Sequence, residues 1–225
     1  MITLAIDTST ALGSVALLNN DRPIAEETFG RDGLFTALAK LKPGKFDQII
    51  VGVGPGSFTG IRAGIAAAKG LVLPGNVPLH AASSFAAIAQ AAAPRMPRDC
   101  PQLCVLSDAR RDEVYFAFYD REGRPTGDCR IGALEEITLH NPVWFVSAEI
   151  ERYREMLRET FGGFASVCEP PVFPNAARLT PMSLPLEPIY LRELSYQKAE
   201  PAPSSTHFLP RAGPGADVGA GGVTG

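Results

Sequence analysis

Residues 48–73 read QIIVGVGPGSFTGIRAGIAAAKGLVL, an apolar run, a glycine-rich turn and a second long apolar stretch. The run at 48–53 is rich in β-branched residues and predicts a buried strand. Gly54, Pro55 and Gly56 mark a turn, and the spacing of the following apolar residues predicts a helix over 57–73. A strand, a tight turn and a long helix in this order are typical of an α/β lobe.

The residues before this unit predict a meander of three strands. Apolar runs at 2–6 and 14–18 flank the turn-forming stretch 7–13, and a third strand follows at 23–29. A short helix is predicted at 34–41, LFTALAKL. Three strands, a helix, a strand and a helix form the first half of a ribonuclease-H-like lobe. We therefore predict the α/β fold of the actin, sugar-kinase and Hsp70 group (ASKHA).

A second α/β segment follows, so that two lobes share the chain. Its predicted elements are a helix at 83–93, strands at 103–107, 113–119 and 143–146, and a helix at 149–160. We predict an N-terminal actin-like lobe at 1–80 and an abbreviated C-terminal lobe at 81–198. From 199 to 225, fifteen of the 27 residues are Ala, Pro or Gly, which predicts a disordered tail because such a segment buries little apolar surface.

Bulk composition narrows the class of protein. The 225 residues are 45% hydrophobic and 20% charged with a net charge of −3, typical of an ordinary globular protein rather than one that neutralises many phosphates alone. The N-terminus lacks a signal-peptide pattern and no run is long enough for a membrane helix, so we expect a cytoplasmic protein. The four cysteines form no CxxC pair, and we predict neither zinc site nor disulfide.

Asp7, Thr8, Ser9 and Thr10 form the first candidate site, a turn directly after the first strand. Hydroxyl and backbone N–H groups there suit a phosphate, while Asp7 suits a hydrated magnesium ion. The alternative is a turn in which these side chains satisfy only the backbone. We favour that alternative, because the matching candidate, Asp108, is followed by Ala, Arg and Arg instead of glycine.

The turn at 54–60, GPGSFTG, resembles an anion site at a helix N-terminus. It lacks the Lys-Ser/Thr pair of a P-loop and the glycines of a GxSxG nucleophile elbow. We therefore predict a structural turn in which Ser57 or Thr59 caps the helix.

The helix at 57–73 is apolar almost all round. Ile61, Ile65, Ala68 and Val72 share one face, and small residues form the opposite face. Cover by its own chain is one explanation, and a partner helix packed on the small face is the other. The predicted partner interface comprises Gly60, Arg62, Ala63, Gly64, Ala66, Ala67, Gly70 and Leu71.

Several segments together resemble one family, TsaB (YeaZ). They are LAIDTST at 4–10, VGVGPGSFTGIRAGIAAAK at 51–69, SSFAAIA at 83–89, DARRDEVY at 108–115 and EPIYLR at 187–192. They occur in the family's order, and the resemblance runs from about residue 2 to about residue 195.

The resemblance implies a non-catalytic scaffold or dimerization subunit of the complex that adds threonylcarbamoyl to the adenosine beside the anticodon of tRNAs reading codons that begin with A. The implied partners are the catalytic TsaD subunit and the TsaE ATPase, with a homodimer when TsaD is absent and tRNA contacted only through the complex. ATP and a metal ion are expected on the partner subunits, and no cofactor on this chain.

Two segments depart from the family pattern. The sequence Arg31-Asp32-Gly33-Leu34-Phe35 stands where a longer first helix with a His-Ser pair usually begins, and Val146-Ser147-Ala148-Glu149 replaces a glycine-rich turn. The competing hypothesis is a sugar-kinase-like or peptidase-like enzyme of the same superfamily. Such an enzyme would need a complete second phosphate loop or a metal-binding histidine pair.

Overall fold

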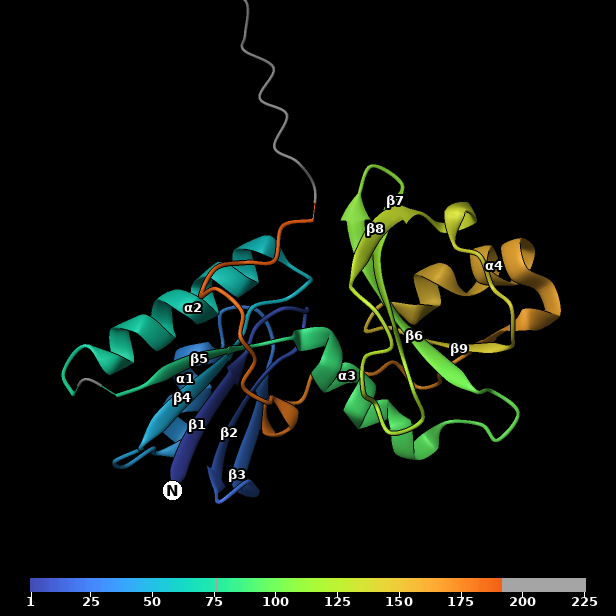
Figure 1. Ribbon diagram of the computed structural model, residues 1–225. Helices are drawn as coiled ribbons and strands as arrows, with labels where there is room; N and C mark the ends of the chain where they lie inside the picture. Colours follow the sequence, from blue (N-terminus) through green and yellow to red (C-terminus); the bar gives the residue numbers. More distant parts are fainter. Residues whose placement is uncertain (76, 192–225) are drawn as a thin grey trace, which may run out of the picture. The chain divides into compact units, whose positions relative to one another are not determined.

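Two five-stranded sheets with the same strand order form the framework of the computed structural model, which describes residues 1–75 and 77–191 (Figure 1). The first sheet has the order β3-β2-β1-β4-β5, and the second has the order β8-β7-β6-β9-β10. In each sheet the first three strands are antiparallel, and the last two run parallel to the first strand. The second half of the chain therefore repeats the topology of the first half.

The elements of the first half are β1 (Ile2–Asp7), β2 (Gly13–Asn19), β3 (Arg22–Phe29), α1 (Leu34–Leu41), β4 (Gln48–Gly52), α2 (Phe58–Val72), β5 (Leu79–Ala82) and α3 (Ser84–Ala92). The elements of the second half are η1 (Ala93–Arg95), β6 (Gln102–Arg110), β7 (Glu113–Tyr119), β8 (Arg130–Ala133), η2 (Leu134–Glu136), β9 (Val143–Val146), α4 (Ile150–Phe161), η3 (Gly162–Phe164), β10 (Ala165–Val167) and η4 (Ala176–Arg178). A single 3-10 turn, η2, connects β8 to β9 where the first half has the helix α1.

The predicted fold class, an α/β ASKHA-like fold, is confirmed, and so are the elements with strong periodicity. Three strands were not predicted, namely β5, β8 and β10. Each is only three or four residues long and contains small or polar residues, unlike the four-residue β9 (VWFV), which is wholly apolar. The pattern in the sequence is therefore too weak to reveal these three strands. The strand predicted at 103–107 was too short, because β6 continues through Asp108 to Arg110.

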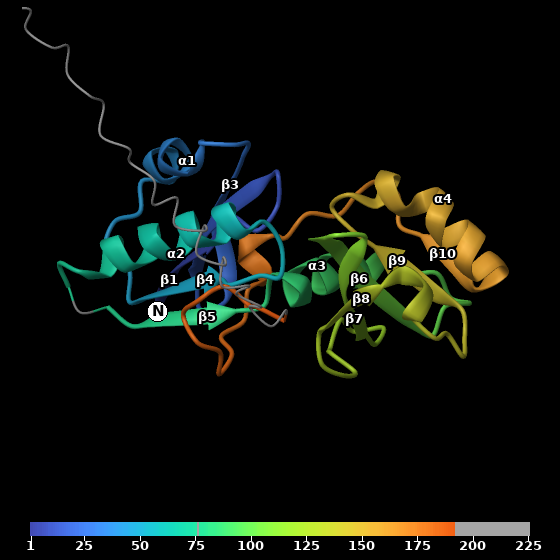
Figure 2. The same ribbon diagram turned by 90° about the horizontal axis from the view of Figure 1, so that it is seen from above.

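Helices α1 and α2 cover one face of the first sheet (Figure 2). The apolar face predicted for α2 is buried there: Ile61, Ile65 and Ala68 pack in the same cluster as Leu4 and Val51. Because burial of such a face supplies most of the stability of a short helix, α2 is held by the sheet along its length.

Each half of the chain contributes its last helical segment to the core around the other half's sheet. Most of α3 packs in the core of the second sheet, through Phe85, Ile88 and Ala92. In return, the chain after β10 comes back to the first sheet, where Ala176 and Leu179 fill its second face. Neither sheet is therefore covered only by the helices nearest to it in sequence.

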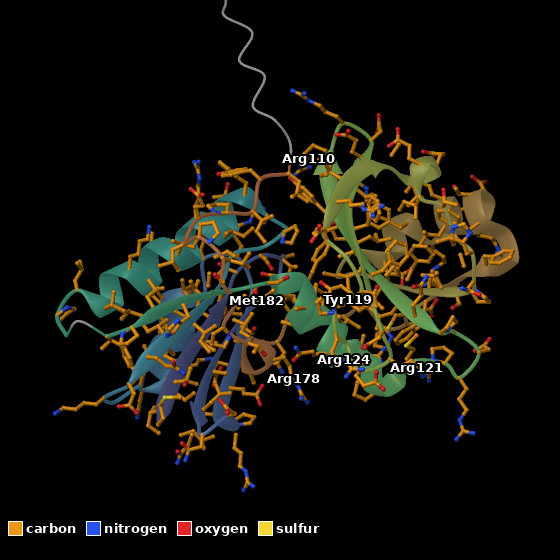
Figure 3. All side chains as sticks on the ribbon, viewed as in Figure 1. Arg110, Tyr119, Arg121, Arg124, Arg178 and Met182 are labelled. Carbon is orange, nitrogen blue, oxygen red and sulfur yellow. The ribbon has the colours of Figure 1, made fainter. Side chains whose placement is uncertain are left out.

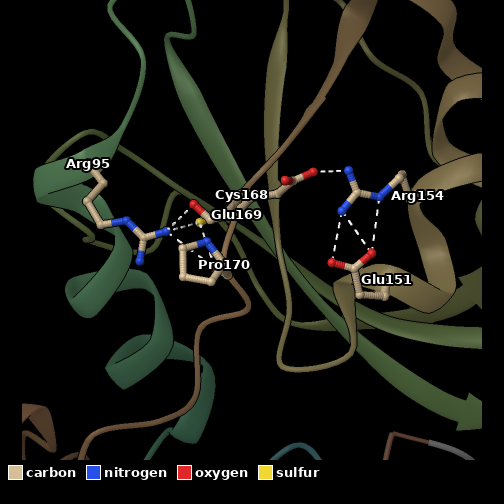
Figure 4. Close-up of polar contacts among 6 residues, drawn as sticks. All are labelled: Arg95, Glu151, Arg154, Cys168, Glu169 and Pro170. Carbon is tan, nitrogen blue, oxygen red and sulfur yellow. Dashed lines mark hydrogen bonds and ion pairs between the residues drawn. The ribbon is translucent and has the colours of Figure 1, made fainter.

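Several polar contacts hold the chain after β10, here called the returning segment, where it leaves the second half. Arg95 donates from Nη2 to the carbonyl oxygens of Glu169 (2.9 Å) and Pro170 (3.3 Å) and to Cys168 Sγ (3.1 Å), as Figure 4 shows. Arg154 of α4 forms an ion pair with the Glu169 side chain (Figure 4). These contacts direct the chain out of the second half.

On the first sheet, Ser14 receives the returning chain. Its hydroxyl donates to the carbonyl oxygen of Pro174 (2.9 Å) and accepts from the amide of Ala176 (2.8 Å). Further along, the amide of Ile189 donates to the carbonyl oxygen of Val53 (3.0 Å). The returning chain is thus tied to strands at both ends of its path.

The predicted division into lobes 1–80 and 81–198 stays a prediction, to which the structure adds that residues between Pro174 and Ile189 pack on the first sheet. Contacts group residues 1–192 into one compact unit. The predicted tail at 199–225 lies outside the described residues. In the described part of the chain, no helix has the length and apolar character needed to cross a bilayer.

The returning segment yields a first prediction. A chain ending at Glu169 loses Ala176 and Leu179, which cover the second face of the first sheet, and Ile189, which packs with the cluster beneath α1 and α2. We expect the free energy of unfolding, measured by chemical denaturation, to fall by about 3 kcal/mol or more. A chain ending at Leu191 keeps these contacts and serves as the control. Equal stability of the two truncated chains would contradict the prediction.

Candidate functional site

The turn after β1 lies unusually close to the start of α2, and glycines make this approach possible. A Cβ atom on Gly60 would overlap the carbonyl oxygen of Thr8, and one on Gly64 would overlap its hydroxyl oxygen. The Thr8 hydroxyl donates to the carbonyl oxygen of Gly60 at 2.7 Å. The same spacing of four residues extends backwards, since Gly56 meets Ser9 and Gly52 meets Asp7.

Asp7 is completely buried beneath this turn. Its Oδ1 accepts hydrogen bonds from the Ser9 amide (2.9 Å) and the Ser9 hydroxyl (2.6 Å), and its Oδ2 accepts from the Ser84 hydroxyl at 2.7 Å. Ser84 begins α3 and in turn accepts from the amide of Gly54 at 3.2 Å. The carboxylate therefore links β1, the glycine-rich turn and α3.

Burial raises the pKa of Asp7 above its ordinary value, while the hydrogen bonds from Ser9 and Ser84 oppose that rise. A magnesium ion bound through water needs carboxylate oxygens that face a hydrated space. The oxygens of Asp7 instead face hydroxyl and amide donors of its own chain. This environment favours the structural interpretation of the turn over a metal-orienting role.

Each of the three hydroxyl groups of the turn already donates a hydrogen bond to an acceptor within the chain. Thr8 donates to Gly60, Ser9 donates to Asp7, and Thr10 donates to the carbonyl oxygen of Leu12 at 2.7 Å. A hydroxyl has a single hydrogen, and phosphate oxygens only accept. None of the three can therefore hold a phosphate without breaking a contact inside the chain.

A cleft of about 270 Å³ opens beside the turn. Its wall from the first half includes Ser9, Thr10 and residues 55–59, and its wall from the second half includes Leu106–Arg110, Tyr115 and Glu149. Ser57 caps α2 there by accepting from the Gly60 amide at 3.3 Å, as predicted for Ser57 or Thr59. Asp7 and Thr8 do not line the cleft.

Asp108, the predicted counterpart of Asp7, does line the cleft but is neutralised by arginines. Its Oδ2 lies 2.8 Å from Arg152 Nη1 and 3.2 Å from Arg110 Nη1, and its Oδ1 accepts from the Arg110 amide at 2.8 Å. Partial burial raises the pKa of Asp108, but these hydrogen bonds and charges outweigh it and lower the pKa. The carboxylate thus serves as an anchor for two cations.

The arginines of the second half do not gather at this cleft. Arg110 lies at the β6–β7 turn, whereas Arg121 and Arg124 lie beyond the other end of β7, near Tyr119 (Figure 3). Arg124 pairs with Asp120 at 2.7 Å, and Arg121 donates to backbone carbonyls. These side chains have local structural partners, so they form no common phosphate-binding surface with Arg110.

The surface predicted on α2 divides into exposed and covered residues. Arg62, Ala63, Ala66 and Gly70 are exposed, Gly60, Ala67 and Leu71 are half-buried, and Gly64 is buried against Thr8. The exposed small residues are available for contact, and their role as a partner interface stays a prediction.

Sequence reasoning missed three residues that complete this region. Ser84 holds Asp7, Arg152 holds Asp108, and Tyr190 packs on α2, with its ring centroid 5.5 Å from that of Phe58 and its hydroxyl 3.1 Å from Arg62 Nη2. Each lies far along the chain from its partner. The sequence offers no spacing that would pair such distant residues.

The glycine spacing predicts a sharp difference between two substitutions on one helix. Gly64→Ala should lower the free energy of unfolding by about 1–3 kcal/mol, because its Cβ must displace Thr8. Gly70→Ala is the control: nothing lies within 4 Å of its Cβ, so higher helix propensity should stabilise the protein by ~0.5–1 kcal/mol. Thermal or chemical denaturation distinguishes the two, and similar effects would refute the steric explanation.

The environment of Asp7 predicts how stability depends on pH. Because burial raises its pKa, the unfolded chain releases this proton at lower pH than the native protein. The stability of the wild type relative to Asp7→Asn should therefore fall over the pH range that begins near the ordinary aspartate pKa of about 4 and extends upward. Denaturant titrations across this range measure the difference. A wild type that gains relative stability as the pH rises would show that the hydrogen bonds dominate.

Comparison with known proteins identifies related sequences. Residues 35–156, more than half of the chain, match the family model described as TsaD: tRNA N6-adenosine threonylcarbamoyltransferase. The tRNA threonylcarbamoyladenosine biosynthesis protein TsaB of Haemophilus influenzae is 36% identical over 129 residues, which cover 53% of this chain and 54% of the relative. TsaB of Escherichia coli is 32% identical over 136 residues, covering 53% and 55%.

The chain thus spans about half the length of these two curated relatives. The solved structure of YeaZ from Pseudomonas aeruginosa superimposes with a TM-score of 0.65 at 26% identity, covering 79% of this chain and 89% of that structure. The family-model match includes the glycine-rich turn and α2. The chain belongs to the TsaB (YeaZ) family.

Proposed function

We propose that this chain takes part in tRNA threonylcarbamoyladenosine biosynthesis as a non-catalytic subunit that binds TsaD. The pathway follows from the names of the related TsaB proteins. The observation that carries the binding role is the exposed small-residue face of α2, where Ala63, Ala66 and Gly70 are uncovered in the described part of the chain. A closely packed partner helix is the natural cover for such a face.

The cleft supports the non-catalytic part of the proposal. An enzyme of the sugar-kinase type needs a carboxylate that can orient a hydrated metal ion beside a phosphate. Here Asp7 accepts three hydrogen bonds from its own chain, and Asp108 contacts two arginines. The competing kinase-like or peptidase-like activity therefore gains no support from these residues.

The wider assembly is part of the same proposal. TsaE would join through TsaD, tRNA would be contacted only through the complex, and a homodimer would form through the same face when TsaD is absent. ATP and a metal ion would then be held by the partner subunits in the cytoplasm. The binding face of this chain is the element on which the proposal depends.

A substitution on that face tests the proposal. Ala66→Arg places a long charged side chain on an exposed position of α2, where it should disturb a partner but not the fold. We expect the affinity for TsaD from the same genome to fall roughly tenfold or more. Size exclusion and calorimetry with the two purified proteins measure this change.

The matched control is Thr180→Arg, which adds the same charge at an exposed position after η4. It should leave TsaD binding unchanged. A wild-type chain that does not bind TsaD would refute the proposed function, and equal losses in both variants would argue against an interface on α2.

A further inference from the structure

Helices α1 and α2 both expose uncharged residues on their outer surfaces. We define the α1–α2 face by the exposed residues Phe35, Ala39, Ala63, Ala66, Gly70 and Leu73. Phe35 is 73% exposed and Leu73 is 83% exposed. Exposed large apolar side chains together with small ones suit contact with a protein rather than with a phosphate backbone.

Helical geometry places the apolar residues of α1 on its exposed surface. On α1, Lys40 reaches Glu27 of β3 at 3.9 Å, which identifies the side that faces the sheet edge. At 100° per residue, Phe35 lies on the far side of α1 from Lys40, and Ala39 lies between the two. Helices α1 and α2 cover the same face of the first sheet (Figure 2). Phe35 and the small residues of α2 are therefore exposed on the same outer layer.

The charges along this face have one sign. Neither α1 nor α2 contains a carboxylate. Arg62 and Lys69 are seven residues apart and form a stripe along the far rim of α2, whereas Lys40 on the opposite rim pairs with Glu27. The rim formed by α2 is therefore basic, and the rim formed by α1 is balanced.

The basic stripe has a fixed position. The Arg62 guanidinium lies 3.7 Å from the centre of the Phe58 ring and donates to the Tyr190 hydroxyl at 3.1 Å. Lys69 is exposed in the last turn of α2. Glu187, on the adjoining returning segment, is exposed and forms no ion pair with either cation within 4.0 Å in the described residues. A docking partner therefore meets a positive rim.

Two-fold symmetry makes this rim unfavourable for self-association. When two copies pack with antiparallel α2 helices, the same surface is used twice, and the stripe of one copy lies beside that of the other. Like charges at short range then repel each other. A different protein with carboxylates at the matching position would gain attraction instead.

We infer that the stripe formed by Arg62 and Lys69 makes the α1–α2 face select an acidic-rimmed protein partner over a second copy of this chain. The inference rests on the proposed function, since it concerns the same face, and it adds the chemistry that decides which partner occupies it. The apolar residues supply contact area in both complexes, and the charged stripe supplies the difference in affinity between them.

Charge reversal at the exposed cation tests the inference. Lys69→Glu should weaken binding to TsaD about three- to tenfold at low salt and should strengthen self-association, because Glu at this position faces Arg62 of the other copy. Arg130→Glu on β8 makes the same change in net charge on the second sheet and should alter neither. Calorimetry measures the first effect, and sedimentation equilibrium measures the second.

The salt concentration provides an independent test, because it should change the affinity for TsaD and the affinity of the chain for itself in opposite directions. Raising the salt from about 0.1 M to about 1 M shortens the Debye length from ~10 Å to ~3 Å. The wild type should then bind TsaD more weakly and itself more tightly.

The outcomes separate the two proposals. If TsaD binding is lost in Ala66→Arg but unaffected by Lys69→Glu and by salt, the charge inference is overturned while the proposed function stands. If the wild type does not bind TsaD at any salt concentration, both fail. If Lys69→Glu weakens binding of tRNA to the isolated chain but not of TsaD, the stripe serves a nucleic acid and the inference is overturned.

Discussion

The close approach of the turn after β1 to the first turns of α2 is the constraint on which the rest of this structure depends. Glycines at every fourth position from Gly52 to Gly64 leave room for the backbone and side chains of Asp7, Thr8 and Ser9. This contact buries a carboxylate, and burial of a charged group is tolerated only with donors around it. Ser9 and Ser84 supply those donors, so that α3 is fixed in the same arrangement.

That arrangement explains how one chain carries two copies of one topology without two independent cores. Because Ser84 is held by Asp7, α3 leaves the first sheet in a fixed direction and fills the core of the second. The chain after β10 returns and covers the first sheet through Ala176 and Leu179. Each sheet depends on a segment that the other half supplies, through contacts between residues that are distant in sequence.

Much of the fold follows from local sequence patterns, and the reason is physical. Strands such as β1 and β4 are runs of buried apolar residues, and α2 shows a clear periodicity, so each was predicted within one or two residues of its bounds. The candidate site was predicted less well. The sequence placed Asp7 and Thr8 in a turn but could not reveal that Ser84 bonds to Asp7 and that Gly60 receives Thr8, since these contacts depend on how distant elements pack. Likewise, Arg152 neutralises Asp108 from a helix that begins 42 residues later.

Small residues on α2 serve two different purposes on opposite sides of the helix. On the inner side, Gly60 and Gly64 admit the turn that contains Thr8. On the outer side, Ala63, Ala66 and Gly70 leave the helix without bulky cover. Because small residues line both sides of α2, a partner that contacted its outer side would lie close to the turn on its inner side. Any displacement of α2 would strain the Thr8 contacts and the buried Asp7 together, since packed cores do not deform gradually. The packed interior therefore holds the exposed residues of α2 in fixed positions, and the close approach of Asp7, Thr8 and Ser9 is what requires glycines along this path.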